Sequence, residues 1–214
     1  MTIPCDQTEY WDRAASSKTF GHPVCWDRIE GTLTPDSRIL DYGCGYGRVC
    51  GELWGKGYRI MVGADSSPAM IDLARKKFPS IDFRVVAPCT FPFEDSAFDL
   101  VLLFTVLTSS PGDREQRTIV EEARRVLRAG GVLYVSDMPL QTDKRNLDRY
   151  DRYVRKYGIY GVFEVEDGAV VRHHDMALIR ELLGDFEEIG LWGIDVETMN
   201  RHRARAFQYV GRKG

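Results

Sequence analysis

The chain of 214 residues carries 29 Lys and Arg against 32 Asp and Glu, so its net charge is −3 and its isoelectric point is about 5.9. This balance provides no overall attraction to nucleic acid, and no apolar run reaches the ~20 residues that a membrane-spanning helix needs. The 43% hydrophobic content is that of an ordinary globular protein, so we expect a single domain over residues 1–214 with a complete core.

The cysteines and the first residues indicate where the protein works. Five cysteines, an odd number without a C-x-x-C pair, are typical of free thiols in a reducing compartment rather than of disulfides or a zinc site. Residues 1–13 lack the basic start and the apolar stretch of a signal peptide. We therefore expect a cytoplasmic protein without a bound metal.

Strand and helix patterns alternate along most of the chain. Residues 10–30 are polar with scattered aromatic residues, which predicts one or two helices over a sheet and a helical cover spanning residues 1–34. Further on, the expected strands are 38–41, 58–65, 81–86, 98–104 and 131–137, and the expected helices are 47–54, 68–77 and 113–128. This alternation favours a doubly wound α/β fold with a mostly parallel sheet, whose ligand crevice lies at the carboxyl ends of the strands.

The most informative segment is the glycine-rich run that follows the first strand. Asp41 ends that strand, and Gly43, Gly45 and Gly47 follow at every second position. Glycine lets the backbone turn sharply and approach a ligand where a Cβ would not fit. Asp65 ends the second strand, twenty residues after Gly45, and an acid at that place suits the two hydroxyls of a ribose. Together these signals predict a nucleoside-containing cofactor.

The identity of that cofactor depends on the residues around the glycines. A nicotinamide dinucleotide site has the pattern G-x-G-x-x-G, but the sixth position of this run is Arg48. Asp41 lies two residues before Gly43, where its carboxylate would repel a pyrophosphate. The same carboxylate would suit a cationic ligand, such as the amino acid end of S-adenosylmethionine. A nicotinamide reductase is therefore disfavoured.

At this point the chain resembles the class I S-adenosylmethionine-dependent methyltransferases. The likeness runs from Ile39 to about Asp137 and rests on the glycine motif, on Asp65, and on the runs 98–103 and 126–133. It implies a Rossmann-like, seven-stranded, mostly parallel sheet with a C-terminal antiparallel hairpin, which residues 186–196 and 204–211 would form. It also implies S-adenosylmethionine as the cofactor and S-adenosylhomocysteine as the product.

The resemblance also assigns cofactor contacts to particular residues. Asp65 would hold the ribose, and Ser66 would lie beside the adenine. The chain departs from the family after the third strand, where residues 87–90 carry no acid for the adenine edge, and a group near Cys89 is left to replace it. In chain order, the implied contacts are Asp41, Gly43, Cys44, Gly45, Asp65, Ser66, Pro88, Cys89, Phe104 and Thr105.

The connection after the fifth strand, residues 138–174, is longer than a strand–helix link requires. Leu147, Tyr150, Val154 and Tyr157 recur at helical spacing, so part of it is predicted to be an amphipathic helix. Its position at the carboxyl edge of the sheet predicts a lid over an acceptor pocket. The tyrosines of this lid would form an aromatic wall or pack it on the body. Its basic residues would be a solvated face or would steer an anionic substrate.

A catalytic base is required only if the acceptor atom carries a proton that must leave. His173 and His174 are the candidates, because histidine titrates near neutral pH and both residues lie at the end of the predicted lid. The alternative is that they lead into a helix that Asp175 caps. A metal site is not expected here, since adjacent histidines in a strand point to opposite faces.

The acceptor is predicted to be a small molecule. Enzymes that methylate base amino groups typically carry Asn/Asp-Pro-Pro-Tyr/Phe after the fourth strand, and residues 104–107 lack that pattern. Cytosine enzymes place a Pro-Cys pair after the fourth strand, whereas Pro88 and Cys89 follow the third. We therefore expect neither a nucleic-acid nor a membrane partner. Another reaction of the same cofactor and a non-catalytic binding role stay open as alternatives, and so does the oligomeric state.

Overall fold

The computed structural model describes residues 3–4 and 6–214, and within these residues seven strands form one sheet. The strands are β1 Arg38–Tyr42, β2 Ile60–Asp65, β3 Asp82–Val85, β4 Phe98–Phe104, β5 Leu127–Asp137, β8 Phe186–Glu197 and β9 Arg203–Lys213. They lie in the order β3-β2-β1-β4-β5-β9-β8, in which the first five are parallel and β9 is antiparallel to both of its neighbours. The doubly wound sheet with a C-terminal antiparallel pair is confirmed.

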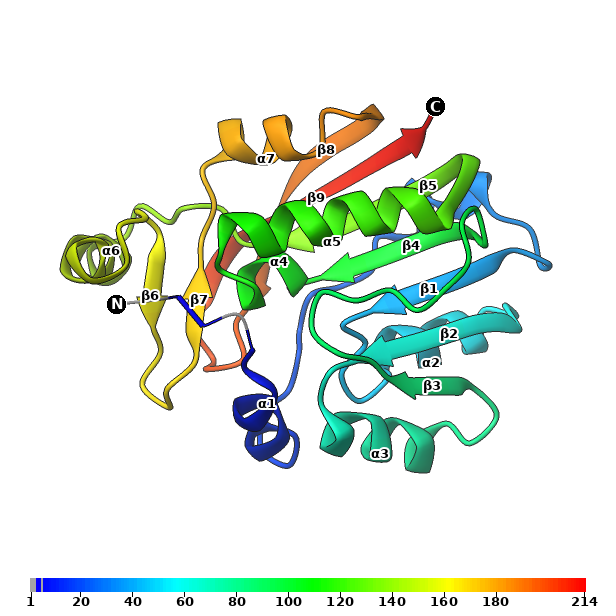
Figure 1. The fold of residues 1–214 in the computed structure, drawn as a ribbon, viewed down its shortest axis with the longest axis horizontal. Coiled ribbons are helices and arrows are strands. Elements are labelled where there is room, and N and C mark those ends of the chain that lie inside the picture. Colours follow the sequence, from blue (N-terminus) through cyan, green and yellow to red (C-terminus); the bar gives the residue numbers. More distant parts are fainter. Residues whose placement is uncertain (1–2, 5) are drawn as a thin grey trace.

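Helices cover both faces of the sheet, because the strands bury apolar side chains on both sides. The helices concerned are α2 Arg48–Gly55, α3 Pro68–Lys77, α4 Val106–Ser109, α5 Asp113–Val126 and α7 Met176–Leu182. In β4, Leu100 and Leu102 face one core, while Val101 and Leu103 face the other. The first core packs α2 and α3 and the second packs α5 and α7, and Figure 1 shows α5 in front of the sheet and α2 behind it.

Two predicted helix starts are confirmed by their caps. The Ser67 hydroxyl accepts from the backbone N–H of Met70 at 3.1 Å, and Pro68 opens α3. The Asp175 carboxylate accepts from the N–H of Ala177 at 2.8 Å ahead of α7. Each cap satisfies a backbone donor that the first helical turn leaves free, and so fixes where the chain enters the helix.

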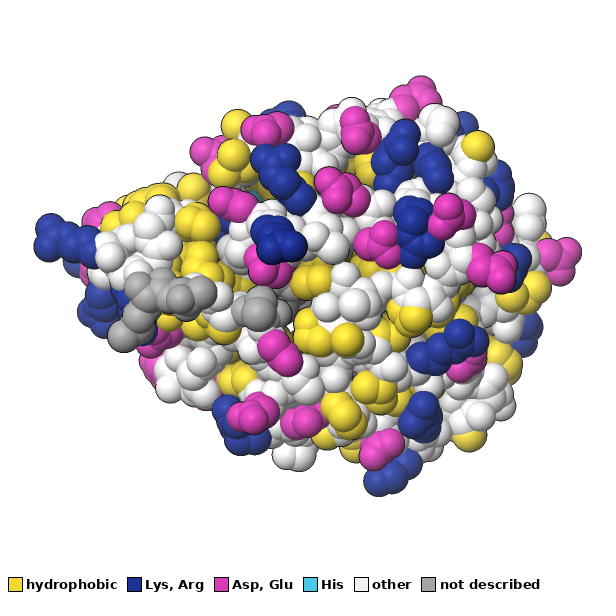
Figure 2. All heavy atoms as spheres, in the orientation of Figure 1, with side chains coloured by type: hydrophobic (Ala, Val, Ile, Leu, Met, Phe, Trp, Pro, Cys, Tyr) yellow, Lys and Arg dark blue, Asp and Glu magenta, His cyan; other side chains and the backbone are white. Residues whose placement is uncertain are grey.

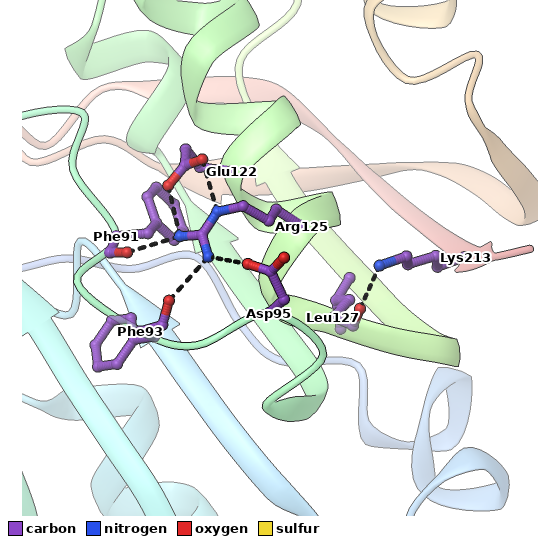
Figure 3. Close-up of polar contacts among 7 residues, drawn as sticks. All are labelled: Phe91, Phe93, Asp95, Glu122, Arg125, Leu127 and Lys213. Carbon is purple, nitrogen blue, oxygen red and sulfur yellow. Dashed lines mark hydrogen bonds and ion pairs between the residues drawn. The ribbon is translucent and has the colours of Figure 1, made fainter.

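One arginine holds the loop between β3 and β4. The guanidinium of Arg125, on α5, donates to the carbonyls of Phe91 and Phe93 at 2.8 and 2.9 Å (Figure 3). It also donates to the carboxylates of Asp95 and Glu122, so all five of its N–H donors are used. The loop that leads from β3 back into the sheet is therefore fastened to a helix rather than left free.

Residues 138–174 form a small substructure of their own at the carboxyl edge of the sheet. Its elements are α6 Lys144–Tyr157, β6 Val162–Glu164 and β7 Val170–Arg172. The amphipathic helix is confirmed, whereas the antiparallel β6–β7 hairpin was not predicted. Tyr150, Phe163 and Val171 form a separate apolar cluster with Tyr10. In Figure 1 these elements lie on the side to which the arrowheads of β1, β2 and β4 point.

The N-terminal segment is only partly helical. It contains α1 (Thr8–Ala14) and two short 3₁₀ turns, Trp26–Arg28 and Glu30–Thr32, with extended and irregular backbone between them. The sequence predicted one or two helices within residues 10–30, and the structure places the longest one earlier. Tyr10 and Ala14 turn toward the cluster of the insertion, which explains the early start of α1.

Hydrogen bonds join this segment to two distant parts of the molecule. The side-chain amide of Gln7 donates to the carbonyl of Val170 on β7 and accepts from the N–H of the same residue, both at 2.8 Å. The carboxylate of Asp12 accepts from the Ser67 hydroxyl at 2.5 Å and from the N–H of Ala69 at 3.1 Å, at the start of α3. The N-terminal segment therefore bridges the insertion and the β2 end of the sheet.

The outer surface carries mixed charge. Figure 2 shows Lys and Arg side chains interspersed with Asp and Glu on the face that carries α5 and α7. Arg117 of α5 and Glu181 of α7, for example, form an exposed ion pair at 3.3 Å. No helix among residues 3–4 and 6–214 is long and apolar enough to cross a membrane.

Candidate functional site

The glycine loop after β1 depends on backbone angles that side chains resist. Gly43 and Gly45 have φ values of +74° and +53°, in the left-handed region that favours glycine. The N–H groups of Gly43 and Cys44 donate to the carbonyl of Ala64 at 2.7 and 3.1 Å, which holds the turn against β2. A Cβ on Gly43 would lie 2.6 Å from Cγ2 of Val106. The packing of α4 therefore requires this glycine as strongly as the turn does.

Asp65 ends β2 and organises the same loop. Its carboxylate accepts from the N–H of Gly45 at 2.8 Å and from the N–H of Ser67 at 2.9 Å. Burial raises the pKa of Asp65 even though these two bonds favour its charged form. Carboxylate oxygens can each accept more than one bond, so the group can also receive hydroxyls of a ligand.

Asp41 is a nearly buried acid at the tip of β1, with 1% of its surface exposed. Its carboxylate accepts from the Cys50 thiol at 3.3 Å. Burial raises the pKa of Asp41 to about 6, while the Cys50 thiol and the nearby Arg48 oppose the shift. A carboxylate in such a place gains most from a cationic group brought beside it.

A cavity of about 740 Å³ runs along the carboxyl edge of the sheet. It brings together all the residues expected to contact a cofactor, which are Asp41, Gly43, Cys44, Gly45, Asp65, Ser66, Pro88, Cys89, Phe104 and Thr105. Cys89 and Thr105 have φ values of 57° and 58° although they are not glycine, and such strain concentrates at functional sites. The volume lies within the range of about 300–1,000 Å³ that small-molecule sites occupy.

Comparison with known proteins identifies this arrangement. Residues 40–135 match the sequence profile of a family described as a methyltransferase domain. The solved structure of an S-adenosylmethionine-dependent methyltransferase from Methanosarcina mazei has a TM-score of 0.81 and 27% identity, and the match covers 86% of this chain and 96% of that one. Residues 40–135 belong to this methyltransferase-domain family, and the chain as a whole shares its fold with an S-adenosylmethionine-dependent methyltransferase.

Curated relatives match the chain over part of their own length. A ubiquinone/menaquinone biosynthesis C-methyltransferase of Campylobacter jejuni is 29% identical over 58% of this chain and 57% of its own length. A 27-O-demethylrifamycin SV methyltransferase of Amycolatopsis mediterranei is 27% identical over 70% of this chain and 57% of its own. The chain thus spans somewhat more than half of these relatives. The cofactor of the family is S-adenosylmethionine, which is converted to S-adenosylhomocysteine.

The tips of the parallel strands and the glycine loop, with Asp41, Gly43 and Asp65, form the inner end of the cavity. The charged groups at this end fit the amino acid end of that cofactor. Asp41 supplies a carboxylate, and Arg48 supplies a guanidinium whose buried Nε has no hydrogen-bond partner among the described residues. The other nitrogens of Arg48 donate to Glu52 at 2.6 Å and to the carbonyl of His22 at 2.5 Å. A ligand with both an ammonium and a carboxylate would meet partners of both signs. The sequence had used Arg48 only to exclude a dinucleotide.

His174 does not reach the cavity. It is 2% exposed, with Nδ1 3.0 Å from the carbonyl of Met138 and Nε2 2.9 Å from the amide nitrogen of Gln116. Burial lowers the pKa of His174. The expected contact with an acceptor finds no support here, because adjacent residues of an extended segment point in opposite directions and His173 takes the cavity side.

His173 lines the cavity as a buried, neutral imidazole that is 7% exposed. Its Nδ1 lies 2.5 Å from the hydroxyl of Tyr150, which also accepts from the N–H of Gln141 at 3.1 Å. Burial lowers the pKa of His173 to about 3, and the adjacent His174 adds to the shift. The expectation that this histidine titrates near neutral pH is therefore wrong, since it took no account of burial.

His22 also lines the cavity, and the sequence did not single it out. Its Nδ1 lies 3.0 Å from the hydroxyl of Ser136 at the end of β5. The amide of Gln208 donates to the same hydroxyl at 3.4 Å and to the carbonyl of Pro23 at 2.7 Å, which positions the segment that carries His22. Burial lowers the pKa of His22 to about 4. No local pattern marks this histidine, because its partner lies 114 positions away.

The outer part of the cavity is lined by the insertion and by the turn between β8 and β9. These lining residues include Arg145, Asn146, Arg149, Phe163, Val165, Glu166, Asp167, Val171 and residues 197–202. Among the residues that the structure describes, no group of three or more His, Cys, Asp or Glu is placed to hold a metal ion. These lining residues offer guanidinium, imidazole, hydroxyl, amide, carboxylate and apolar groups to a ligand.

Proposed function

We propose that the chain transfers a methyl group from S-adenosylmethionine to a small-molecule acceptor. The observation behind this proposal is that one cavity runs from the strand tips to the insertion. The hollow that Asp41, Gly43 and Asp65 line at the sheet edge is lined further out by α6 and the β6–β7 hairpin. Methyl transfer needs donor and acceptor in one enclosed space, with their reacting atoms in line. A cavity with cofactor-type residues at one end and a separate wall at the other supports such an arrangement.

In this proposal the chain holds and orients the cofactor rather than reacting with it. Asp65 accepts from the ribose hydroxyls, and Asp41 and Arg48 hold the amino and carboxylate groups. The cofactor, when bound, supplies a methyl group that its sulfonium already activates. The remaining inner contacts that we assign are Gly43, Cys44, Gly45, Ser66, Pro88, Cys89, Phe104 and Thr105.

We assign proton handling at the acceptor to His22 and His173. Nδ1 of each is engaged, by Ser136 and Tyr150 respectively, and no hydrogen bond from Nε2 is formed within the described part of the chain. Both imidazoles are neutral near pH 7, so each offers the cavity one donor or one acceptor nitrogen, and the tautomer decides which. A base is required only for an acceptor atom that must lose a proton.

We also propose that residues 138–174 act as a lid within a single domain of residues 1–214. The insertion has its own small apolar cluster, and its bonds to the body include those between Gln7 and Val170. A lid of this kind excludes water and orders when its ligands bind. Hydrogen exchange of α6 amides should therefore slow when cofactor and acceptor are bound together, and an unchanged rate would argue for a fixed wall.

The names of two relatives support a small organic acceptor. One is named for ubiquinone/menaquinone biosynthesis and the other for demethylrifamycin. We extend only the class of acceptor to this chain, without a nucleic-acid or membrane partner. A cytoplasmic location is part of the proposal, supported by Cys25, Cys44 and Cys50, which form no disulfide within the described residues.

Calorimetry and a product assay test this proposal. S-adenosylmethionine and S-adenosylhomocysteine should bind the wild-type chain, whereas NAD should not. Release of S-adenosylhomocysteine should then be measured against a panel of small acceptors. Cofactor binding without turnover on any of them would favour the non-catalytic role. Binding of NAD in place of both sulfur nucleosides would refute the proposal.

A further inference from the structure

The six basic residues of α6 fall into two groups. Four are exposed or form an ion pair with Asp148 of the helix or Glu164 of β6, namely Lys144, Arg152, Arg155 and Lys156. Arg145 and Arg149 instead line the cavity, one helical turn apart. The basic face that the sequence suggested is therefore split, and two of its charges point toward the place where an acceptor would lie.

Neither of these two guanidinium groups forms an ion pair within the described residues, although the charges of Asp143 and Glu166 attract Arg149 from a greater distance. Nη1 of Arg145 is buried without a hydrogen bond, and none of the ion pairs formed there includes Arg145 or Arg149. Arg149 lies over the ring of Phe163 at 4.5 Å and donates to Asn146 at 3.3 Å. Burial and the neighbouring Arg145 lower the pKa of Arg149. Like charges one turn apart disfavour each other, so both gain from an anion placed beside them.

The acids around this arginine pair are engaged elsewhere or exposed. Asp143 caps α6 by accepting from the N–H of Asn146 at 3.2 Å. Asp167 forms an ion pair with Lys18. Glu166 is exposed at the turn of the β6–β7 hairpin, on the rim of the cavity. The arginine pair is therefore available to an acid that a ligand brings in.

The wall beside the pair is apolar. Phe163, Val165 and Val171 of the hairpin belong to one cluster with Met199 of the β8–β9 turn, and all four line the cavity. Guanidinium groups recognise carboxylate and phosphate oxygens through paired N–H donors. This combination suits a ligand that carries one anionic group on an apolar body.

We propose that Arg145 and Arg149 form a subsite for a carboxylate or phosphate group of the methyl acceptor. The acceptor is then a small organic acid or phosphoester with an apolar body. The term acceptor rests on the proposed function, whereas anion binding rests on the contacts alone. The amino acid end of the cofactor already has Asp41 and Arg48 at the sheet edge, which leaves the α6 pair to the second ligand.

The test uses the wild-type chain and its variants, each saturated with S-adenosylhomocysteine, and three probes of similar shape. Benzoate and phenyl phosphate carry the two anionic groups, and benzamide is the uncharged match for benzoate. In NMR titrations, the wild-type chain should bind at least one anion and should bind benzamide far more weakly. Arg145→Gln and Arg149→Gln should each weaken anion binding by roughly tenfold or more. Arg152→Gln, an exposed change on the same helix, should leave it unaltered.

Each outcome decides the inference. A preference for benzoate or for phenyl phosphate names the group and supports the subsite. Equal binding of benzoate and benzamide, or anion binding that survives both cavity substitutions, overturns it. Weaker binding of S-adenosylhomocysteine by Arg145→Gln also overturns it, because the arginines would then hold the cofactor. Anion binding by the pair without methyl transfer to any small acceptor would defeat the proposed function and leave the anion subsite standing.

Discussion

The two ends of the cavity are built in different ways. The inner end is made from the tips of parallel strands, where sheet hydrogen bonds and the left-handed angles of Gly43 and Gly45 set the shape. The outer end is made from long side chains such as Arg145 and Arg149, carried on elements of the insertion that pack on their own cluster. A backbone-defined site is difficult to alter without disturbing the sheet. A site made from side chains on an insertion can change its ligand by substitution alone.

The most severe way to break the inner end is Gly43→Val. We expect no measurable binding of S-adenosylhomocysteine in calorimetry, because valine must adopt a φ of +74° and its Cβ would meet Val106 Cγ2 at 2.6 Å. The backbone strain alone costs about 1–3 kcal/mol. Gly55→Ala is the matched control, since nothing lies within 4 Å of the added Cβ. Binding within tenfold of wild type would remove this loop from the cofactor site.

Asp65→Ala should weaken the inner end without destroying it. Loss of charge-assisted bonds worth about 1.5–3 kcal/mol should raise the dissociation constant of S-adenosylhomocysteine by roughly ten- to a hundredfold. The substitution also removes the acceptor of the Gly45 and Ser67 N–H groups, so circular dichroism should check that the fold persists. Ser66→Ala should have a smaller effect. An unchanged constant in Asp65→Ala would place the ribose elsewhere.

Asp41 makes the inner end sensitive to rising pH. Its pKa, raised by burial from 3.8 to about 6, means that the folded chain holds a proton that the unfolded chain has lost. The unfolding free energy of the cofactor-free chain should therefore fall as pH rises from about 4 to 6. Asp41→Asn should remove this loss of stability, so its unfolding free energy at pH 7, measured with denaturant, should exceed that of the wild-type chain by up to about 3 kcal/mol. The variant should also bind the cofactor more weakly. Equal stability of the two proteins at pH 7 would contradict the burial argument.

His173, at the outer end, should make the folded chain less stable as pH falls, whereas Asp41 makes it less stable as pH rises. Its pKa is lowered by burial from 6.5 to about 3, so the unfolded chain binds the extra proton and the unfolding free energy falls as pH drops below about 6.5. His173→Gln should reduce the loss between pH 7 and pH 5 by about 2 kcal/mol, while the affinity for S-adenosylhomocysteine stays constant. His202→Gln, at an exposed position, is the control. If His173→Gln and the wild-type chain lose the same unfolding free energy between pH 7 and pH 5, water reaches the imidazole in the folded protein.

The same division explains what could be predicted from the sequence. The inner end was predictable because a strand, a turn and two acids follow one another within residues 38–65, and local pattern fixes both their structure and their place. The hairpin of β6 and β7 escaped prediction because each strand has only three residues. The sequence left the basic residues of α6 as either a solvated face or an anion-steering one, and it could not single out Arg145, because its place in the cavity depends on how distant segments pack. His22 was missed for the same reason. His22 meets Ser136 across 114 positions, and no single-sequence signal reports such a contact.

The N-terminal segment also bears on how ligands come and go. Gln7 binds the backbone of β7 and Asp12 binds the start of α3, and between and beyond these anchors Trp11, Lys18 and Phe20 line the cavity. One stretch of chain thus lines the cavity and is bonded both to the insertion and to the β2 end of the sheet. Exchange at either end would require the same few hydrogen bonds to open, so departure of the spent cofactor and of the methylated product would share one gate. Shortening the segment would then speed exchange of both ligands together.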